Sequence, residues 1–144
     1  LKPFTAYGPL FEYFGDKYNA ASVISTANYQ YPGSTSIMYN YGKITYGNKT
    51  LTDSLRLSLN TPVGRIDDEI LGSFRMKTFL HNNNLDVKST YSSVDGIGLN
   101  VSTLDTASAY NGLNNLGEYI YPRFVDTITF IDGSTKKIEK RNAL

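Results

Sequence analysis

The sequence predicts a mainly β fold, an antiparallel sandwich or barrel with one or two short helices, and an α+β fold is the alternative. Three observations lead to this prediction. Apolar and polar residues alternate over residues 49–59, as in a half-buried strand. The dipeptides Gly47-Asn48 and Asp132-Gly133 are typical of tight hairpin turns. No series of long helices alternates with the expected strands, as a doubly wound parallel sheet would require.

The N-terminal part of the chain combines a helical and a β pattern. Apolar and aromatic residues recur at helical spacing, which predicts a short helix over residues 9–19. Gly15 in its middle costs such a helix about 1 kcal/mol. β-Branched residues then favour a strand over residues 22–30. Pro32 and Gly33 follow as a turn.

A hairpin is expected next. Residues 36–46 are rich in Tyr, Ile and Thr, and residues 49–59 continue the β pattern after the Gly-Asn turn. One face of the second strand carries four leucines, Leu51, Leu55, Leu57 and Leu59. Asp53 interrupts this face, which indicates a bulge or a later start of strand pairing.

The middle of the chain is expected to form further strands. Three acidic residues at positions 67–69 would complement the N-terminal dipole of a helix. Gly72 and the alternation that follows it favour a strand instead, and we predict one over residues 69–80. A second strand is expected over residues 85–91, and alternating apolar residues continue over 97–101.

The C-terminal part is expected to hold one helix and one hairpin. Residues 104–116 have helical spacing, and Ser102 or Thr103 can cap this helix. Residues 124–131 are apolar and β-branched, and residues 134–139 pair back after the Asp-Gly turn.

Composition limits the domain organisation and the partners. No repeat and no linker interrupts residues 1–144, so we expect a single globular domain. No apolar run approaches the roughly 20 residues of a membrane helix, so no membrane span is expected. The net charge is only +1, whereas proteins that neutralise many phosphates carry a basic excess, so nucleic acid is not an expected partner.

The chemistry-bearing residue types are few. Cysteine is absent, which excludes thiolate catalysis and cysteine-ligated metals. The one histidine, His81, stands beside three asparagines in an expected loop, and a lone histidine cannot form a multi-histidine metal site. The acidic triplet at positions 67–69 lacks the spacing of an EF-hand. No nucleotide-binding or zinc-protease motif is present, so we predict no catalytic residue, no metal site and no cofactor.

Tyrosine is the most informative residue type. Of the 12 tyrosines, 8 lie within residues 7–46. Tyrosine offers a large apolar area with a polar tip and is enriched at interfaces. The alternative is that these rings fill the core and the cross-strand pairs of an ordinary β protein. The candidate binding residues are Tyr29, Tyr31, Tyr39, Tyr41 and Tyr46.

Composition therefore favours a non-enzymatic structural or interaction subunit of an extracellular, cell-surface or virion assembly. Its expected partners are protein subunits, through self-assembly by the tyrosine-rich surface, or a glycan or small ligand. The first alternative is a ligand- or glycan-binding β-barrel or sandwich. The second is a small hydrolase that uses two carboxylates. The acidic residues available for such a pair are Glu12, Asp16, Asp53, Asp86, Asp95 and Glu118.

Overall fold

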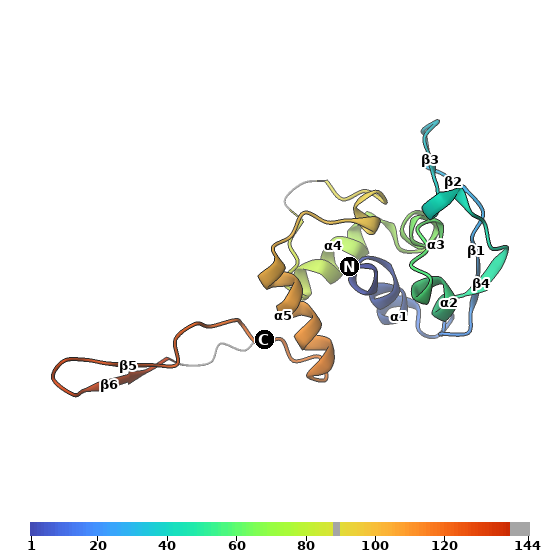
Figure 1. Cartoon of the computed structure of the whole chain (residues 1–144). Coiled ribbons are helices and arrows are strands. Elements are labelled where there is room, and N and C mark those ends of the chain that lie inside the picture. The colour runs from blue at the N-terminus through green and yellow to red at the C-terminus, as the bar shows by residue number, and fades with distance from the viewer. Residues whose placement is uncertain (88–89, 139–144) are drawn as a thin grey trace. The chain divides into compact units, whose positions relative to one another are not determined.

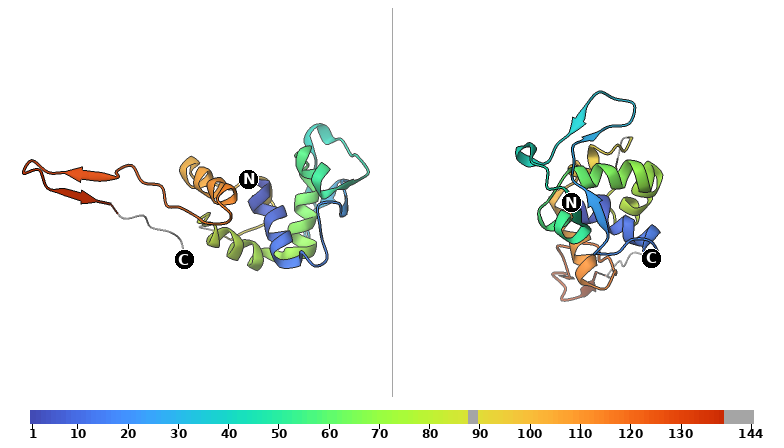
Figure 2. Two further views of the ribbon diagram at one scale, coloured as in Figure 1. Left: turned by 90° about the horizontal axis from the view of Figure 1, so that it is seen from below. Right: turned by 90° about the vertical axis from the view of Figure 1, so that its right-hand side faces the viewer.

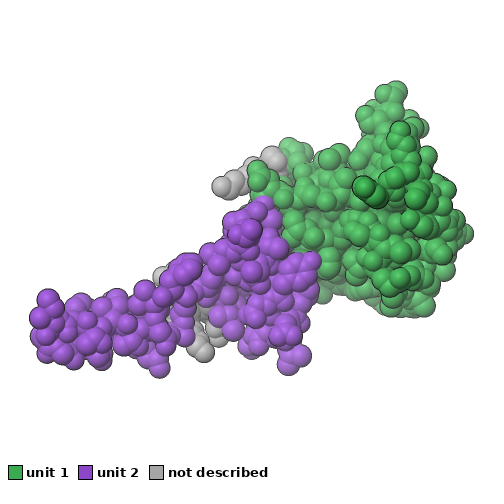
Figure 3. All heavy atoms as spheres, viewed as in Figure 1, with its two compact units in different colours: residues 1–82, 86–100 green, residues 83–85, 101–144 purple. Residues whose placement is uncertain are grey.

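The computed structural model describes residues 1–87 and 90–138, which belong to two compact units (Figure 3). Unit 1 comprises residues 1–82 and 86–100, and unit 2 comprises residues 83–85 and 101–144. Across the described part of the chain, no helix has the length and apolar character needed to cross a membrane. The expectation of one globular domain over residues 1–144 stays a prediction.

Most of the regular secondary structure of unit 1 is helical (Figure 1). Its α-helices are α1 (Gly8–Phe14), α2 (Leu51–Arg56), α3 (Thr61–Arg65) and α4 (Gly72–Asn82). Two wider π-type turns, Pro3–Tyr7 and Ile66–Leu71, lead into α1 and α4, and tighter 3₁₀ turns lie at Tyr41–Lys43 and Asp95–Ile97. Prolines stand in the first turns of the Pro3–Tyr7 segment, α1 and α3, where the missing N–H group would have no partner within the helix.

Two small antiparallel sheets complete unit 1. In the first, β1 (Val23–Ser25) pairs with β4 (Asn48–Thr50), with Ile24 opposite Lys49. In the second, β2 (Tyr29–Gln30) pairs with β3 (Ile37–Met38), with Tyr29 opposite Met38. Each sheet has only two short strands, so its stability depends on packing against the helices.

The turn Pro3–Tyr7 lies at the centre of unit 1. It contacts α1, α2, α3 and α4 as well as the turns at residues 66–71 and 95–97. Figures 1 and 2 show this blue start of the chain beside α4. Phe4, Thr5 and Ala6 are fully buried, and burying a side chain as large as Phe4 contributes about 1.5–3 kcal/mol. The packing therefore fixes the backbone next to Lys2, the residue that precedes the turn.

Unit 2 contains α5 (Thr103–Asn114) and a hairpin of β5 (Thr127–Thr129) with β6 (Thr135–Lys137). These elements confirm the helix predicted over residues 104–116 and the hairpin predicted around the Asp-Gly turn. Ser102 caps α5, because its Oγ accepts a hydrogen bond from the amide of Asp105 at 3.0 Å. The expected second strand of the hairpin extends to Glu139, which lies outside the described residues.

The mainly β prediction is wrong, because the described elements form an α+β arrangement rather than a sandwich or barrel. Residues 51–56, within the expected strand 49–59, form α2. The Oγ1 of Thr50 accepts from the amide of Asp53 at 3.0 Å and caps this helix. Most of the expected strand 69–80 forms α4.

Other expected strands are shorter than predicted or missing. The strand expected over residues 22–30 is divided into β1 and β2, and the helix expected over 9–19 ends at Phe14 as α1. Residues 85–87, 90 and 91 are not in a strand, and residues 88 and 89 of that expected strand lie outside the described part. Residues 97–101 form no strand either.

Candidate active site

The side chain of Lys2 meets two polar residues from a distant part of the sequence. Its Nζ donates hydrogen bonds to the carbonyl oxygen of Ser58 at 2.5 Å, to Ser58 Oγ at 3.1 Å and to Asn60 Oδ1 at 2.7 Å. A lysine ammonium carries three donors, so the three bonds can form together. We call Lys2, Ser58 and Asn60 the lysine cluster.

Local backbone structure places each member of the lysine cluster. Lys2 directly precedes the buried turn Pro3–Tyr7. Ser58 follows α2 with a φ of +52°, in the left-handed region that non-glycine residues seldom occupy. Such strain persists only where the surrounding structure enforces it, and it gathers at functional positions. Asn60 directly precedes α3, so both ends of the segment from Ser58 to Asn60 are anchored by helices.

Asn40 holds the backbone on which Asn60 stands. Its Oδ1 accepts hydrogen bonds from the backbone amides of Asn60 at 2.9 Å and Thr61 at 3.1 Å. Its Nδ2 donates to the carbonyl oxygens of Thr26 at 3.0 Å and Ile44 at 3.1 Å. The side chain of Asn60 in turn donates to the carbonyl oxygen of Tyr39 at 3.1 Å, so Asn60 has little freedom to turn away from Lys2.

Partial burial lowers the pKa of Lys2 from its ordinary 10.5 to about 8, because withdrawal from water disfavours the charged ammonium. With this pKa, about a tenth of the Lys2 side chains are neutral at pH 7. A neutral amine can accept a proton, and Ser58 Oγ is close enough to exchange one with it. The lysine cluster is therefore equipped to activate a nucleophile and to move its proton.

The predicted binding tyrosines occupy different environments. Tyr29 is buried, and its hydroxyl donates to Asp68 Oδ2 at 3.0 Å. Its ring meets that of Tyr31 edge-on at 6.2 Å between centroids, and the guanidinium of Arg65 lies 5.0 Å from the Tyr29 ring. Tyr29 is thus part of the folded core.

The other tyrosines are more open. Tyr31 lines a cleft together with Asp67 and Asp68. Tyr39 is half-buried beneath the ammonium of Lys43, 5.1 Å from its ring centroid. Tyr41 is 96% exposed and Tyr46 40% exposed. The structure brings Tyr29 and Tyr31 into ring contact, and the binding role of all five stays a prediction.

His81 and Asp86 form a pair at the surface, without the burial expected of a catalytic pair. His81 Nδ1 lies 2.6 Å from Asp86 Oδ1, but the two side chains are 73% and 67% exposed. Exposed ion pairs contribute little to stability. Within residues 1–87 and 90–138, no three or more His, Asp or Glu side chains gather as a metal site.

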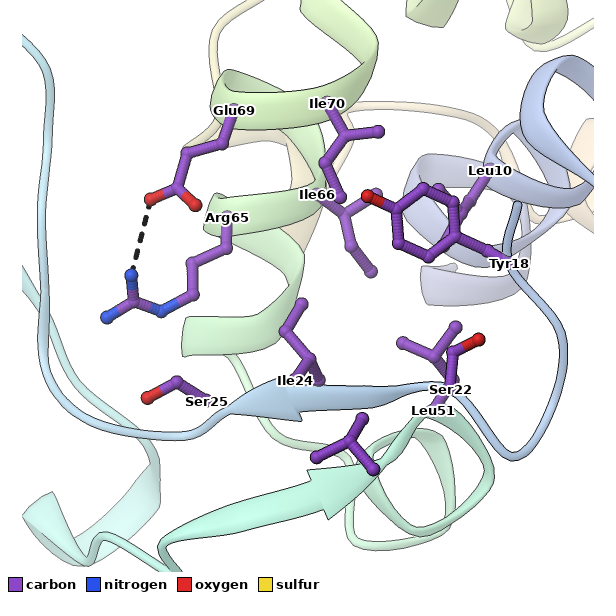
Figure 4. Close-up of a pocket in the computed structure, with 11 residues that line it drawn as sticks. Leu10, Tyr18, Ser22, Ile24, Ser25, Leu51, Arg65, Ile66, Glu69 and Ile70 are labelled. Carbon is purple, nitrogen blue, oxygen red and sulfur yellow. Dashed lines mark hydrogen bonds and ion pairs between the residues drawn. The ribbon is translucent and has the colours of Figure 1, made fainter.

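A separate cavity of about 400 Å³ lies between α1, β1 and α3 (Figure 4). Leu10, Tyr18 and Ile66 form part of its apolar wall, and the ion pair between Arg65 and Glu69 stands at its opposite side. No member of the lysine cluster lines this cavity. The lysine cluster and this cavity are therefore separate features of unit 1.

The sequence analysis missed all three members of the lysine cluster. The available signal is the triplet Ser58-Leu59-Asn60, which has the serine and asparagine of the Ser-Asp-Asn motif found in one class of serine acyltransferases. A triplet with two fixed positions arises often by chance. Only the fold shows that Lys2 meets it.

Comparisons with known proteins identify the family of the chain. The model of the family "Penicillin binding protein transpeptidase domain" matches residues 14–143. Penicillin-binding protein 1A of Streptococcus oralis is 34% identical over 95% of this chain and 22% of its own length. Its namesake from Streptococcus pneumoniae is 32% identical over 95% of this chain and 20% of its own length. The chain thus spans about a fifth of these relatives.

Solved structures share the fold. Penicillin-binding protein 1A of Haemophilus influenzae has a TM-score of 0.83 at 22% identity, over 99% of this chain and 21% of that one. Penicillin-binding protein A of M. tuberculosis, solved as an acyl-enzyme complex with ceftriaxone, has a TM-score of 0.81 at 16% identity, over 98% of this chain and 36% of that one.

These matches correct the functional expectations. The prediction of a non-enzymatic structural or interaction subunit is wrong, because transpeptidase domains are enzymes. The β-barrel alternative and the two-carboxylate hydrolase are wrong as well. The extracellular, cell-surface or virion localisation is also wrong, because penicillin-binding proteins act in peptidoglycan synthesis at the bacterial cell envelope.

Proposed function

Because this chain belongs to the penicillin-binding protein transpeptidase domain family, we propose that it supplies the lysine cluster to the acyl-transfer centre of a D,D-transpeptidase. The observation that carries the proposal is the position of Lys2 Nζ, 3.1 Å from Ser58 Oγ and 2.7 Å from Asn60 Oδ1. Substrate class and location follow the family: the acyl donor is a peptide of peptidoglycan, at the cell envelope.

Family motifs support the assignment of each residue. Penicillin-binding proteins carry a Ser-x-x-Lys motif with the nucleophilic serine and a Ser-Asp-Asn motif. Ser58 and Asn60 match the ends of the second motif, with Leu59 in place of the acidic residue. We assign Lys2 to the lysine of the first motif because it contacts both. In that motif the nucleophilic serine stands three positions before the lysine.

Each member of the lysine cluster has a role in the proposed acyl transfer. The neutral amine of Lys2 takes the proton of the attacking serine, whose oxygen bonds to the carbonyl carbon of the acyl donor. The bond from this carbon to the leaving amine breaks, and that amine takes up the proton, for which Ser58 Oγ is the relay beside Nζ. An acceptor amine then attacks the carbonyl carbon of the resulting ester and loses a proton to Lys2 Nζ, the bond from this carbon to the serine oxygen breaks, and the serine oxygen takes the proton back from Nζ. Asn60 Oδ1 keeps Nζ in place during both acylation of the serine and transfer to the acceptor amine.

Covalent labelling with penicillin tests the proposal. The full-length gene product is incubated with fluorescent penicillin, and the adduct is measured by intact-mass spectrometry and mapped by peptide analysis. We expect one adduct, on a serine three residues before Lys2. The variant Lys2→Met should acylate about 10²–10⁴ times more slowly, the usual contribution of a general base. Lys77→Met, which removes an exposed lysine of α4, is the matched control.

Two results would overturn the proposal. One is a folded gene product that forms no adduct at any penicillin concentration. The other is a Lys2→Met variant that acylates at the rate of the Lys77→Met control.

A further inference from the structure

We propose that Asp67 and Tyr91 are positioning residues, which hold the turn Pro3–Tyr7 and through it the catalytic Lys2. This inference rests on the proposed function, because it concerns the same site. Neither residue touches the lysine cluster. Both act through Thr5, which stands three residues after Lys2 in the buried turn.

The first link runs through the hydroxyl group of Tyr91. It donates a hydrogen bond to Asp67 Oδ2 at 2.8 Å and lies 3.4 Å from the carbonyl oxygen of Thr5. Tyr91 is 4% exposed and Asp67 2% exposed, so water does not compete for these contacts. A buried hydrogen bond of this kind is costly to break, because the remaining partner is left without solvent.

The second link runs from the same turn to the Asp95–Ile97 segment. Thr5 Oγ1 donates to the carbonyl oxygen of Gly96 at 2.5 Å. Gly96 also packs directly on Asp67, since a Cβ atom added to Gly96 would lie 2.2 Å from Asp67 Oδ2. Asp67, Tyr91, Thr5 and Gly96 are therefore joined by three hydrogen bonds, and the packing of Gly96 on Asp67 completes a network next to the turn that begins after Lys2.

The charge state of Asp67 bears on this network. Its Oδ1 accepts no hydrogen bond within the described residues. Burial, followed by the nearby charges of Asp68 and Asp95, raises the pKa of Asp67 to about 8, although the Tyr91 hydrogen bond opposes the shift. Loss of the proton places a charge with one donor in a buried site beside two other carboxyl groups. We expect the hydrogen-bonded residues to rearrange so that the charged Asp67 carboxylate is better solvated. This rearrangement should displace the turn that follows Lys2.

The pH dependence of penicillin acylation separates positioning from a merely structural role. In the unmodified protein the rate constant should rise with the neutral fraction of Lys2 and fall again as Asp67 ionises, with a maximum near pH 8. Asp67→Asn cannot ionise and keeps an oxygen for the Tyr91 hydroxyl. It should show only the rising limb and exceed the unmodified protein by about tenfold at pH 9, one unit above the pKa of Asp67.

Two further variants complete the design. Tyr91→Phe removes the hydroxyl, and we expect the saturating acylation rate constant to fall about tenfold while the half-saturating penicillin concentration stays unchanged, since the hydroxyl bonds to Asp67 and the Thr5 carbonyl rather than to the lysine cluster. Asp86→Asn removes an exposed carboxylate that pairs with His81, and it should keep the unmodified pH profile. Thermal melting of each variant confirms that it is folded at the assay temperature.

The outcomes are distinct from those of the proposed function. If the unmodified protein acylates but Asp67→Asn retains the falling limb, the positioning role is overturned and the role of Lys2 stands. The same conclusion follows if folded Tyr91→Phe acylates at the unmodified rate. Absence of acylation in the unmodified protein overturns the proposed function itself.

Discussion

The side-chain oxygen of Asn40 accepts a hydrogen bond from the backbone amide of Asn60 at 2.9 Å. This single contact joins the segment after β3 to the residue that holds Lys2 Nζ. Asn40 is 3% exposed, and both ends of its side-chain amide are occupied. The position of Asn60, and hence of the lysine amine, therefore depends on a residue that does not itself contact Lys2 in any described hydrogen bond.

Replacement of Asn40 should weaken both stability and acylation. Asn40→Ala leaves the amides of Asn60 and Thr61 without their acceptor, and each unsatisfied buried group costs about 1–3 kcal/mol. We expect a loss of at least about 2 kcal/mol in the free energy of unfolding, measured by urea denaturation. Acylation by penicillin should slow at least tenfold under conditions where the variant is folded. Asn100→Ala, at an exposed position of the same unit, should change neither quantity.

The acylation rate should also report the pKa of Lys2 directly. In the Asp67→Asn background, where Lys2 alone governs the profile, the rate constant should rise tenfold per pH unit below about pH 8 and level off above it. Stopped-flow measurement over pH 6–10 checks this. A profile that is flat from pH 6 upward would mean that the amine is already neutral there or takes no part in proton transfer.

The sequence predicted those elements whose turn or cap chemistry is local. The Ser102 cap and helical spacing placed α5, and Asp132-Gly133 placed the β5–β6 hairpin. The strand prediction over residues 49–59 was wrong, because the leucines at positions 51 and 55 fit helical spacing as well as strand alternation. The cap that decides in favour of α2 comes from Thr50 and Asp53.

The candidate site was harder to predict than the fold, because its members come from separate segments. Lys2 and Ser58 are 56 positions apart, and only the packing of the Pro3–Tyr7 turn against α2 and α3 brings them together. The tyrosines drew attention by their number, yet Tyr29 is largely a core residue. The number of tyrosines reflects composition, whereas the proposed site consists of a few common residue types that only their geometry distinguishes.

Substitution of Gly96 should disrupt the packing around Asp67. A Cβ atom at this position would lie 2.2 Å from Asp67 Oδ2 and 2.8 Å from Val63 Cγ1, so the backbone or both neighbours must move. Overpacking of this kind typically costs about 1–3 kcal/mol. Gly98→Ala is the matched control, because an added Cβ there meets no atom within 4 Å. Thermal melting should show a lower midpoint for Gly96→Ala alone, and equal midpoints would contradict the close packing.

Loss of the Ser102 cap should destabilise α5. Its Oγ accepts from the amide of Asp105 at 3.0 Å, and replacement of such a cap by alanine costs about 1 kcal/mol. Hydrogen exchange of the first-turn amides of α5 should become faster in Ser102→Ala. Ser102→Asp retains an acceptor at the cap position and should preserve the protection. Faster exchange in both variants would indicate that the hydroxyl itself, rather than an acceptor, is required.

The stability of the protein should depend on pH through Asp67. Its pKa is about 8 in the folded protein against 3.8 for the ordinary group, so unfolding releases a proton at pH values between these two. Because the folded state binds more protons in this window, the free energy of unfolding falls as the pH rises from about 4 to 8 and levels off above. The contribution of this carboxyl is thus fully present below pH 4 and lost as the pH passes through 8.

Urea denaturation of matched variants isolates this contribution. Asp67→Asn does not titrate, so its stability relative to the unmodified protein should increase steadily between pH 5 and pH 8. Glu12→Gln, which removes an exposed carboxylate of α1, should keep a constant difference over the same range. A constant difference for Asp67→Asn as well would mean that the buried carboxyl ionises with its ordinary pKa in the folded protein, and the network under the Lys2 turn would then carry a charge at neutral pH.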